Sequence, residues 1–238
     1  MKKCFSVVSS VLLLSLVSCG EKTNNRKQLS VQNFFQTEKG IYEAKLESLN
    51  SHLGDEARGK AIIKLKGDEM LVEIQMDGTE AQIVHGQFLH VSDQCPTLSS
   101  DTNNDGIIDD LEGRMNYGSA LIPLDSDLST QGEEKFIFPR ADFSGNYSYR
   151  SQTNWTKMIT DLLLKDTNPS DGLVKLNSAF NLKGRQIVIK GISPNVNLPE
   201  SVKAIGSEDI HGSIPVACGT LIKVASDDGY SDYNGGKD

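Results

Sequence analysis

The segment Ala61-Ile62-Ile63-Lys64-Leu65-Lys66-Gly67-Asp68-Glu69-Met70-Leu71-Val72-Glu73-Ile74-Gln75-Met76 decides the fold of this chain. Its apolar and polar residues alternate on both sides of Gly67-Asp68, a dipeptide that favours a tight two-residue turn. Successive side chains of a β-strand point to opposite faces, so each half of the segment acquires one apolar face. The segment therefore predicts a β-hairpin that buries one face and exposes the other.

The same two-residue period recurs before and after this hairpin. Near the start of the domain, Tyr42, Ala44 and Leu46 alternate with charged residues. Further strands are predicted at 82–91, 135–138, 185–190 and 216–224. Short strands separated by turn residues predict an all-β fold, either an antiparallel sandwich or a barrel.

One segment departs from this pattern and predicts a short helix. In residues 154–165 the apolar side chains follow helical spacing, and Thr153 or Asn154 is the expected N-cap. The apolar positions are Trp155, Met158, Ile159, Leu162 and Leu163. We expect this stripe to pack against the core of the domain.

The N-terminus predicts export and a lipid anchor. Lys2 and Lys3 precede an apolar run over 5–17, which is typical of a signal peptide and too short for a membrane span with flanks of its own. The run ends in Leu16-Val17-Ser18-Cys19-Gly20, which resembles the lipobox of bacterial lipoproteins. The resemblance implies cleavage before Cys19, lipid on Cys19 that attaches the chain to a membrane, and a location in the bacterial cell envelope. Gly20 after the cysteine favours the outer membrane, and an ordinary cleaved signal peptide is the alternative.

Composition then divides the chain into four parts. Residues 1–18 are the signal peptide, 19–38 the lipidated cysteine with a polar tether, 39–224 one β domain, and 225–238 an acidic disordered tail. The net charge is −8 and no basic block is present, which predicts no nucleic-acid partner.

The chain has four cysteines, and two of them remain available for pairing. Cys4 lies in the signal peptide, and Cys19 is the expected lipid acceptor. Cys95 and Cys218 remain in an oxidising compartment, where an isolated pair usually forms a disulfide. Two buried free thiols are the alternative.

Residues 101–112, Asp-Thr-Asn-Asn-Asp-Gly-Ile-Ile-Asp-Asp-Leu-Glu, match the calcium loop of an EF-hand. Ca²⁺ requires about six to eight oxygen ligands, which such a loop supplies at alternate positions. The expected ligands are Asp101, Asn103, Asp105, the backbone carbonyl of Ile107, Asp109 and Glu112. Gly106 permits the sharp turn of the loop. An acidic surface turn that binds nothing is the alternative.

The flanks of this loop favour a structural calcium ion over a sensor. A sensor needs an amphipathic helix on each side of the loop. Pro96 precedes the loop, and Gly113, Gly118 and Pro123 follow it, so we expect an exit helix of one turn at most. No second loop is present in the sequence to pair with the first.

Three segments resemble copper/zinc superoxide dismutase and the related chordin-type (CHRD) domain. They are Val84-His85-Gly86-Gln87-Phe88-Leu89-His90-Val91 with Cys95 downstream, Gly184-Arg185-Gln186-Ile187-Val188-Ile189-Lys190, and Gly212-Ser213-Ile214-Pro215-Val216-Ala217-Cys218-Gly219. The resemblance covers most of residues 40–224, apart from the calcium insertion and the helix near Trp155. It implies an antiparallel Greek-key β-sandwich or barrel of the superoxide dismutase type.

The residues at the metal positions of that family are largely replaced. His90 matches one copper ligand, whereas Phe88, Ala120 and Lys190 stand where the family has other ligand histidines, and Pro215 replaces its substrate-guiding arginine. A redox-active copper needs several imidazole ligands. We therefore expect neither copper nor zinc, and no dismutase catalysis.

These observations predict a calcium-binding, lipid-anchored envelope protein that acts as a non-enzymatic binding or structural module. Its partner would be an envelope or surface protein that the sequence does not identify. The alternative is a divergent dismutase or copper-binding protein that uses His85, His90 and His211. A third possibility is a calcium-responsive adhesin or assembly module whose contact surface is the insertion.

Overall fold

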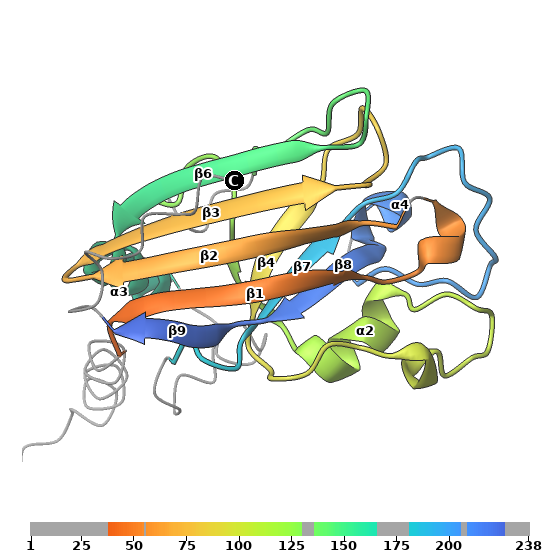
Figure 1. Ribbon diagram of the computed structural model, residues 1–238. Coiled ribbons are helices and arrows are strands. Elements are labelled where there is room, and N and C mark those ends of the chain that lie inside the picture. The colour runs from red at the N-terminus through yellow and green to blue at the C-terminus, as the bar shows by residue number, and fades with distance from the viewer. Residues whose placement is uncertain (1–37, 55, 130–135, 166–180, 206–208, 227–238) are drawn as a thin grey trace, which may run out of the picture.

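The computed structural model describes residues 38–54, 56–129, 136–165, 181–205 and 209–226 (Figure 1). The predicted signal peptide, Cys19, most of the tether and most of the acidic tail lie outside these residues. None of the described helices is long and apolar enough to cross a membrane.

Five antiparallel strands form the first layer. In spatial order they are β9 (Ile222–Ser226), β1 (Gly40–Ser48), β2 (Arg58–Lys66), β3 (Glu69–Asp77) and β6 (Tyr147–Asn154). The predicted hairpin is confirmed, because Lys66 pairs with Glu69 across Gly67 and Asp68. Gly67 has a φ of 53°, a left-handed conformation that costs glycine little.

Four antiparallel strands form the second layer, which lies behind the first in Figure 1. In spatial order they are β5 (Ala120–Pro123), β4 (Gly86–His90), β7 (Gln186–Lys190) and β8 (Pro215–Thr220). β8 also pairs with the end of β1 through Glu47 and Ser48, so the two layers are joined there. The all-β antiparallel class predicted from the sequence is confirmed.

The core lies between the two layers and follows the two-residue period. From the first layer, Ile63 and Ile74 are fully buried, and from the second layer Leu89 and Ile189 face them in the same cluster. Each buried aliphatic side chain contributes about 1.5 to 3 kcal/mol. Alternate residues of the second layer, among them Val188, therefore point away from this core.

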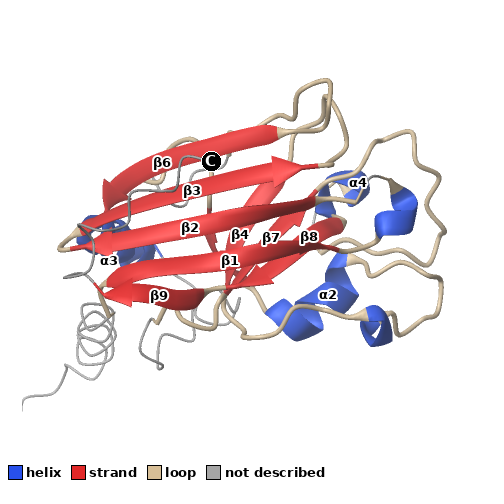
Figure 2. Cartoon of the chain, viewed as in Figure 1, coloured by secondary structure: helices blue, strands red, loops and turns tan. Residues whose placement is uncertain are grey.

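Short helices lie at the ends of the layers (Figure 2). They are η1 (Ser51–Leu53), η2 (Leu98–Ser100), α2 (Asp110–Tyr117), α3 (Trp155–Lys165) and α4 (Ile210–Ser213). α3 is the helix predicted from the sequence, and the side chain of Asn154 accepts a hydrogen bond from the Lys157 amide at 2.7 Å, so Asn154 is the N-cap. Trp155, Met158 and Ile159 are buried in the core, while side chains from 162 onward lie outside the described part.

Several predicted boundaries were wrong. Residues 136–138 are not in a strand, and the segment predicted as one strand at 216–224 divides into β8 and β9 at Leu221. β9 continues to Ser226, past the expected start of the tail. The short strand β5 and the polar strand β6 were not predicted, because β6 buries Tyr147, Tyr149 and Thr153 rather than aliphatic residues.

Candidate calcium site

The predicted calcium loop belongs to residues 92–118, which lie between β4 and β5; this segment is called the insertion below. The ends of the insertion meet, because the Ser92 amide donates to the Tyr117 carbonyl at 3.0 Å. Tyr117 packs in a small cluster with Val188 of β7 and Cys218 of β8. These two residues point away from the main core, so the insertion covers the outer face of the second layer.

The first half of the loop is shaped by side chains that bond to its own backbone. The carboxylate of Asp101 accepts hydrogen bonds from the amides of Asp105 (3.2 Å) and Gly106 (2.8 Å). Asn103 accepts from the Asp105 amide at 2.8 Å, and Asp105 accepts from the Ile107 amide at 2.9 Å. Gly106 has a φ of 89°, as the sharp turn requires. Three of the predicted ligands therefore have their side chains turned toward the inside of the loop.

The second half of the loop is fixed by the start of α2. Asp109 is the N-cap and accepts from the Glu112 amide at 2.9 Å, while Glu112 accepts from the Asp109 amide at 3.3 Å, which is a capping box. The other carboxylate oxygen of Glu112 accepts from the Thr102 amide and hydroxyl, both at 2.8 Å, and from the Asn103 amide at 3.2 Å. Glu112 thus joins the end of the loop to its beginning.

The expectation of a one-turn exit helix was wrong, because α2 has eight residues. Gly113 lies inside this helix and does not end it. A Cβ at this position would lie 2.6 Å from the hydroxyl of Tyr117, so glycine is required by the close packing of the tyrosine ring. The helix ends at Gly118, whose φ is 74°.

The loop concentrates negative charge that basic side chains do not balance. Asp109 is 2% exposed and Glu112 is 6% exposed. Burial, together with the nearby charge of Glu112, raises the pKa of Asp109. In the described part of the chain, no lysine or arginine forms an ion pair with Asp101, Asp105, Asp109 or Glu112. Buried carboxylates without a nearby positive charge are costly, and this set of oxygen donors suits Ca²⁺.

The carboxylates of the loop do not form a complete coordination shell. Among the described residues, no three His, Cys, Asp or Glu side chains lie close enough together to hold a metal ion. Glu112 is engaged by Thr102 and Asn103, so a metal that used both of its oxygens would replace those hydrogen bonds. The ligand set inferred from the sequence thus stays a prediction.

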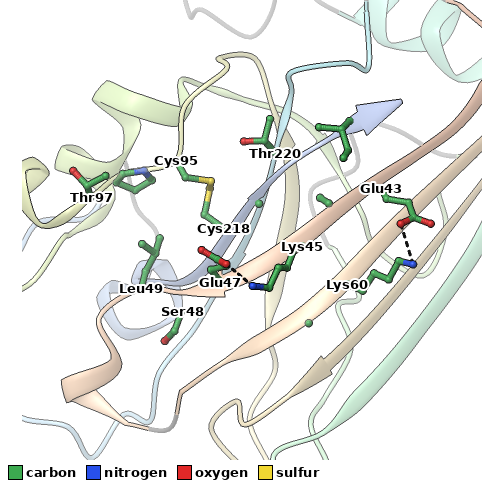
Figure 3. A pocket seen from close by; sticks show the side chains of 15 residues that line it. Glu43, Lys45, Glu47, Ser48, Leu49, Lys60, Cys95, Thr97, Cys218 and Thr220 are labelled. Carbon is green, nitrogen blue, oxygen red and sulfur yellow. Dashed lines mark hydrogen bonds and ion pairs between the residues drawn. A yellow bond between two sulfur atoms is a disulfide. The ribbon is translucent and has the colours of Figure 1, made fainter. Parts of the chain in front are cut away.

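A disulfide fixes the beginning of the insertion. Cys95 and Cys218 are bonded, with their Cα atoms 5.8 Å apart, which confirms the predicted pair (Figure 3). The bond ties the segment before the loop to β8. It borders a pocket of about 610 Å³ in which the charged side chains labelled in Figure 3 pair with one another, Glu43 with Lys60 and Lys45 with Glu47.

A buried ion pair fixes α2. Lys190 of β7 lies 2.5 Å from the carboxylate of Asp110, and both side chains are buried. Tyr117 donates a hydrogen bond to the same carboxylate oxygen at 3.1 Å, and the ammonium lies 5.5 Å from the centre of the Phe88 ring. Asp110 was not identified from the sequence, since it stands at a loop position that does not bind metal.

Asn50 holds the middle of the loop, and this role was not predicted from the sequence. Its side-chain amide donates to the Ile108 carbonyl and accepts from the Ile108 amide, both at 2.8 Å. It also donates to the Pro215 carbonyl at 3.0 Å. Asn50 adopts a φ of 53°, a conformation that asparagine tolerates better than most residues. One side chain therefore links the loop to the start of β8.

The segment 193–205 covers the other side of the loop. The hydroxyl of Ser201 donates to Asp105 at 2.6 Å, and the backbone amide of Lys203 donates to Asp109 at 2.7 Å. Ile107 packs in a cluster with Ile192, Val202 and Ile214. The loop is thus an integrated part of the domain.

The three histidines of the copper-binding alternative each contact different backbone carbonyls. Both ring nitrogens of His85 contact backbone carbonyls, those of Lys190 and Glu80, and His211 contacts the Val196 carbonyl. His90 donates from Nδ1 to the Gly118 carbonyl at 2.9 Å, and its Nε2 is buried with no hydrogen-bond partner among the described residues. Burial, followed by the charge of Lys190, lowers the pKa of His90 to about 3.

The residues that the sequence resemblance aligns with ligand positions lie together on the second layer. His90 pairs with Ala120, and Lys190 is opposite Gly86 on the neighbouring strand. Phe88 lies between them and presents its ring to His90 with centres 6.2 Å apart. An apolar ring and an ammonium group therefore stand where a copper site would need nitrogen ligands.

Comparison with models of protein families found no match for this chain, and comparison with curated proteins found no match either. The resemblance to the dismutase and chordin-type domains thus depends on the three sequence segments.

Proposed function

We propose that this chain is a calcium-binding, lipid-anchored envelope protein of superoxide dismutase-like fold that serves as a binding or structural module without catalysis. The observation that carries the proposal is the loop 101–112. The carboxylates of Asp101, Asp105 and Glu112 accept hydrogen bonds from amides of the loop. No described lysine or arginine forms an ion pair with these three residues or with Asp109. A bound divalent cation would offset their charge.

Calcium acts here as a structural ion. The disulfide, the Lys190–Asp110 ion pair and Asn50 hold the insertion at its beginning, end and middle. A loop held at three points has little freedom to reorient as a sensor does. Because the metal must replace hydrogen bonds on Glu112, we expect a dissociation constant of ~10⁻⁴ to 10⁻³ M, the range of extracellular modules.

The superoxide dismutase-like topology and the lack of dismutase activity are part of the same proposal. The two-layer antiparallel architecture and the positions of His90, Ala120 and Lys190 on adjacent strands support the relation. The ring of Phe88 and the ion-paired Lys190 argue against a catalytic copper. The copper-binding alternative is not favoured, because His85 and His211 bond to backbone carbonyls.

The lipid anchor is supported by the sequence Leu16–Gly20. Replacement of Cys19 by serine should abolish incorporation of radiolabelled fatty acid into the protein. Labelling that persists in this variant would contradict the anchor.

The calcium proposal is tested by thermal melts in calcium and in chelator. At a calcium concentration of ~100 times the dissociation constant, binding stabilises by about 2.7 kcal/mol, which corresponds to a rise of about 5 to 10 °C for a domain of this size. Glu112→Gln should remove most of this rise. The control is Asp142→Asn, since Asp142 forms a similar turn with the amides of Ser144 and Asn146 outside the loop. Equal melting points for the unaltered protein in calcium and in chelator would contradict the proposal.

A further inference from the structure

We propose that Lys190 is a positioning residue for the calcium site. Its ammonium group holds Asp110 and thereby sets the rotation of α2, so that Asp109 and Glu112 face the loop. This inference rests on the calcium binding proposed above and adds a residue of β7, remote in sequence from the loop, to the determinants of calcium affinity.

The geometry of the first turn of α2 carries the argument. Successive helical residues point about 100° apart, so Asp110 and Glu112, which lie two residues apart within α2, point to nearly opposite sides of the helix. Asp110 faces β7, where Lys190 lies at 2.5 Å, while Asp109 and Glu112 bond to each other and to the loop. Fixing Asp110 therefore fixes the direction of the two carboxylates beside it.

The ion pair is strong enough in its surroundings to act as such an anchor. Both side chains are buried, and Tyr117, seven residues further along α2, bonds to the same oxygen of Asp110. The backbone of Lys190 is itself held, since its carbonyl contacts His85. Removal of the ammonium alone would leave a buried carboxylate without its cation, which is strongly unfavourable. Asp110 would then turn toward solvent and rotate α2.

Positioning and simple electrostatics predict opposite changes in calcium affinity when the charge of Lys190 is removed. A positive charge close to a calcium site repels the metal, so removing the charge of Lys190 should tighten calcium binding if only the field matters. If Lys190 positions the ligands, removing it should weaken binding. Groups that orient metal ligands typically contribute about 10- to 100-fold to affinity.

The experiment compares calcium affinity, by calorimetric titration of the whole exported chain, with the melting point in chelator. Lys190→Met should weaken calcium binding at least about tenfold. Lys190→Arg, which keeps the charge, should recover most of the affinity. The control is Lys64→Met, which removes the lysine of the Lys64–Glu73 pair at 2.9 Å between β2 and β3 and should leave calcium affinity unchanged.

A second variant covers the case in which Lys190→Met does not fold. Replacing both partners with apolar residues, Lys190→Met with Asp110→Leu, leaves no buried charge unpaired and leaves the net charge near the loop unchanged. Electrostatics alone predicts unaltered calcium affinity for this variant, whereas positioning predicts the same weakening as Lys190→Met.

The outcomes separate the two proposals. If the unaltered protein does not bind calcium, the proposed function fails and the positioning role fails with it. If the unaltered protein binds calcium, and the folded variants with methionine at position 190 bind it as tightly or more tightly, the positioning role alone is overturned. A lower melting point in chelator with unchanged calcium affinity would likewise reduce Lys190 to a structural residue.

Discussion

Asn50 offers a direct test of how the proposed calcium loop is attached to the domain. Its side chain makes three hydrogen bonds, two to Ile108 and one to Pro215, at 2.8 to 3.0 Å. Ile108 is only 3% exposed, so its backbone groups have little access to water when Asn50 is shortened. We predict that Asn50→Ala destabilises the domain more than its position in a surface connection suggests.

The magnitude follows from two contributions. Each hydrogen bond contributes about 1 kcal/mol net, so three lost bonds give about 3 kcal/mol. Alanine at a φ of 53° adds about 1 kcal/mol of backbone strain. Glycine has no such strain, so Asn50→Gly should cost about 3 kcal/mol and Asn50→Ala about 4 kcal/mol.

The assay is equilibrium unfolding in urea, in chelator, for each variant. Gln82 supplies the matched control, because it also has a positive φ, 62°, but its side chain makes one hydrogen bond, 3.3 Å long, to Ala141. Gln82→Ala should cost only about 1 kcal/mol, from about one hydrogen bond, because glutamine and alanine bear the same strain at a positive φ. If Asn50→Gly costs less than about 1 kcal/mol, the side chain does not hold the loop as described.

Three further predictions concern the disulfide, the buried histidine and copper. Reduction of Cys95–Cys218, which closes a sequence separation of 123 residues, should lower the free energy of unfolding by about 4 to 5 kcal/mol; equal urea midpoints with and without reductant would contradict this. The pKa of His90 is about 3 in the folded chain and about 6.5 when unfolded, so the unfolded state binds more protons between these values. The contribution of His90 to stability is therefore present above pH ~6.5 and is lost as pH falls toward 3, by up to about 1.4 kcal/mol per pH unit. In chelator, His90→Gln should make the free energy of unfolding depend less steeply on pH. An unchanged pH dependence would refute the lowered pKa of His90. The purified protein should contain no stoichiometric copper or zinc and should not accelerate superoxide loss, while Phe88→His with Lys190→His should raise copper affinity; copper-dependent turnover that disappears in His90→Ala would contradict this.

Local patterns in the sequence predicted the local structure well. The hairpin about Gly67, the helix capped by Asn154 and the Cys95–Cys218 bond depend on short-range periodicity, capping chemistry and cysteine count. β6 was not predicted because its buried face carries tyrosine and threonine, so its sequence does not show an alternation of aliphatic and polar residues. The length of α2 was misjudged because Gly113 serves packing against Tyr117 and does not stop the helix.

The contacts that attach the site could not be predicted from the sequence. Asn50 and Ile108 are 58 residues apart, and Asp110 and Lys190 are 80 residues apart, so neither pair leaves a local pattern. In the sequence, Lys190 was notable only because it stands where the family that the chain resembles has a ligand histidine. Its partner became evident when the fold placed α2 against β7.

Direct titration of the purified chain with calcium, after removal of bound metal, tests the central claim most directly. We predict one calcium ion per chain, a dissociation constant of ~10⁻⁴ to 10⁻³ M, and a marked loss of affinity in Glu112→Gln. The absence of saturable binding up to about 10 mM calcium, well above that range, would contradict the account.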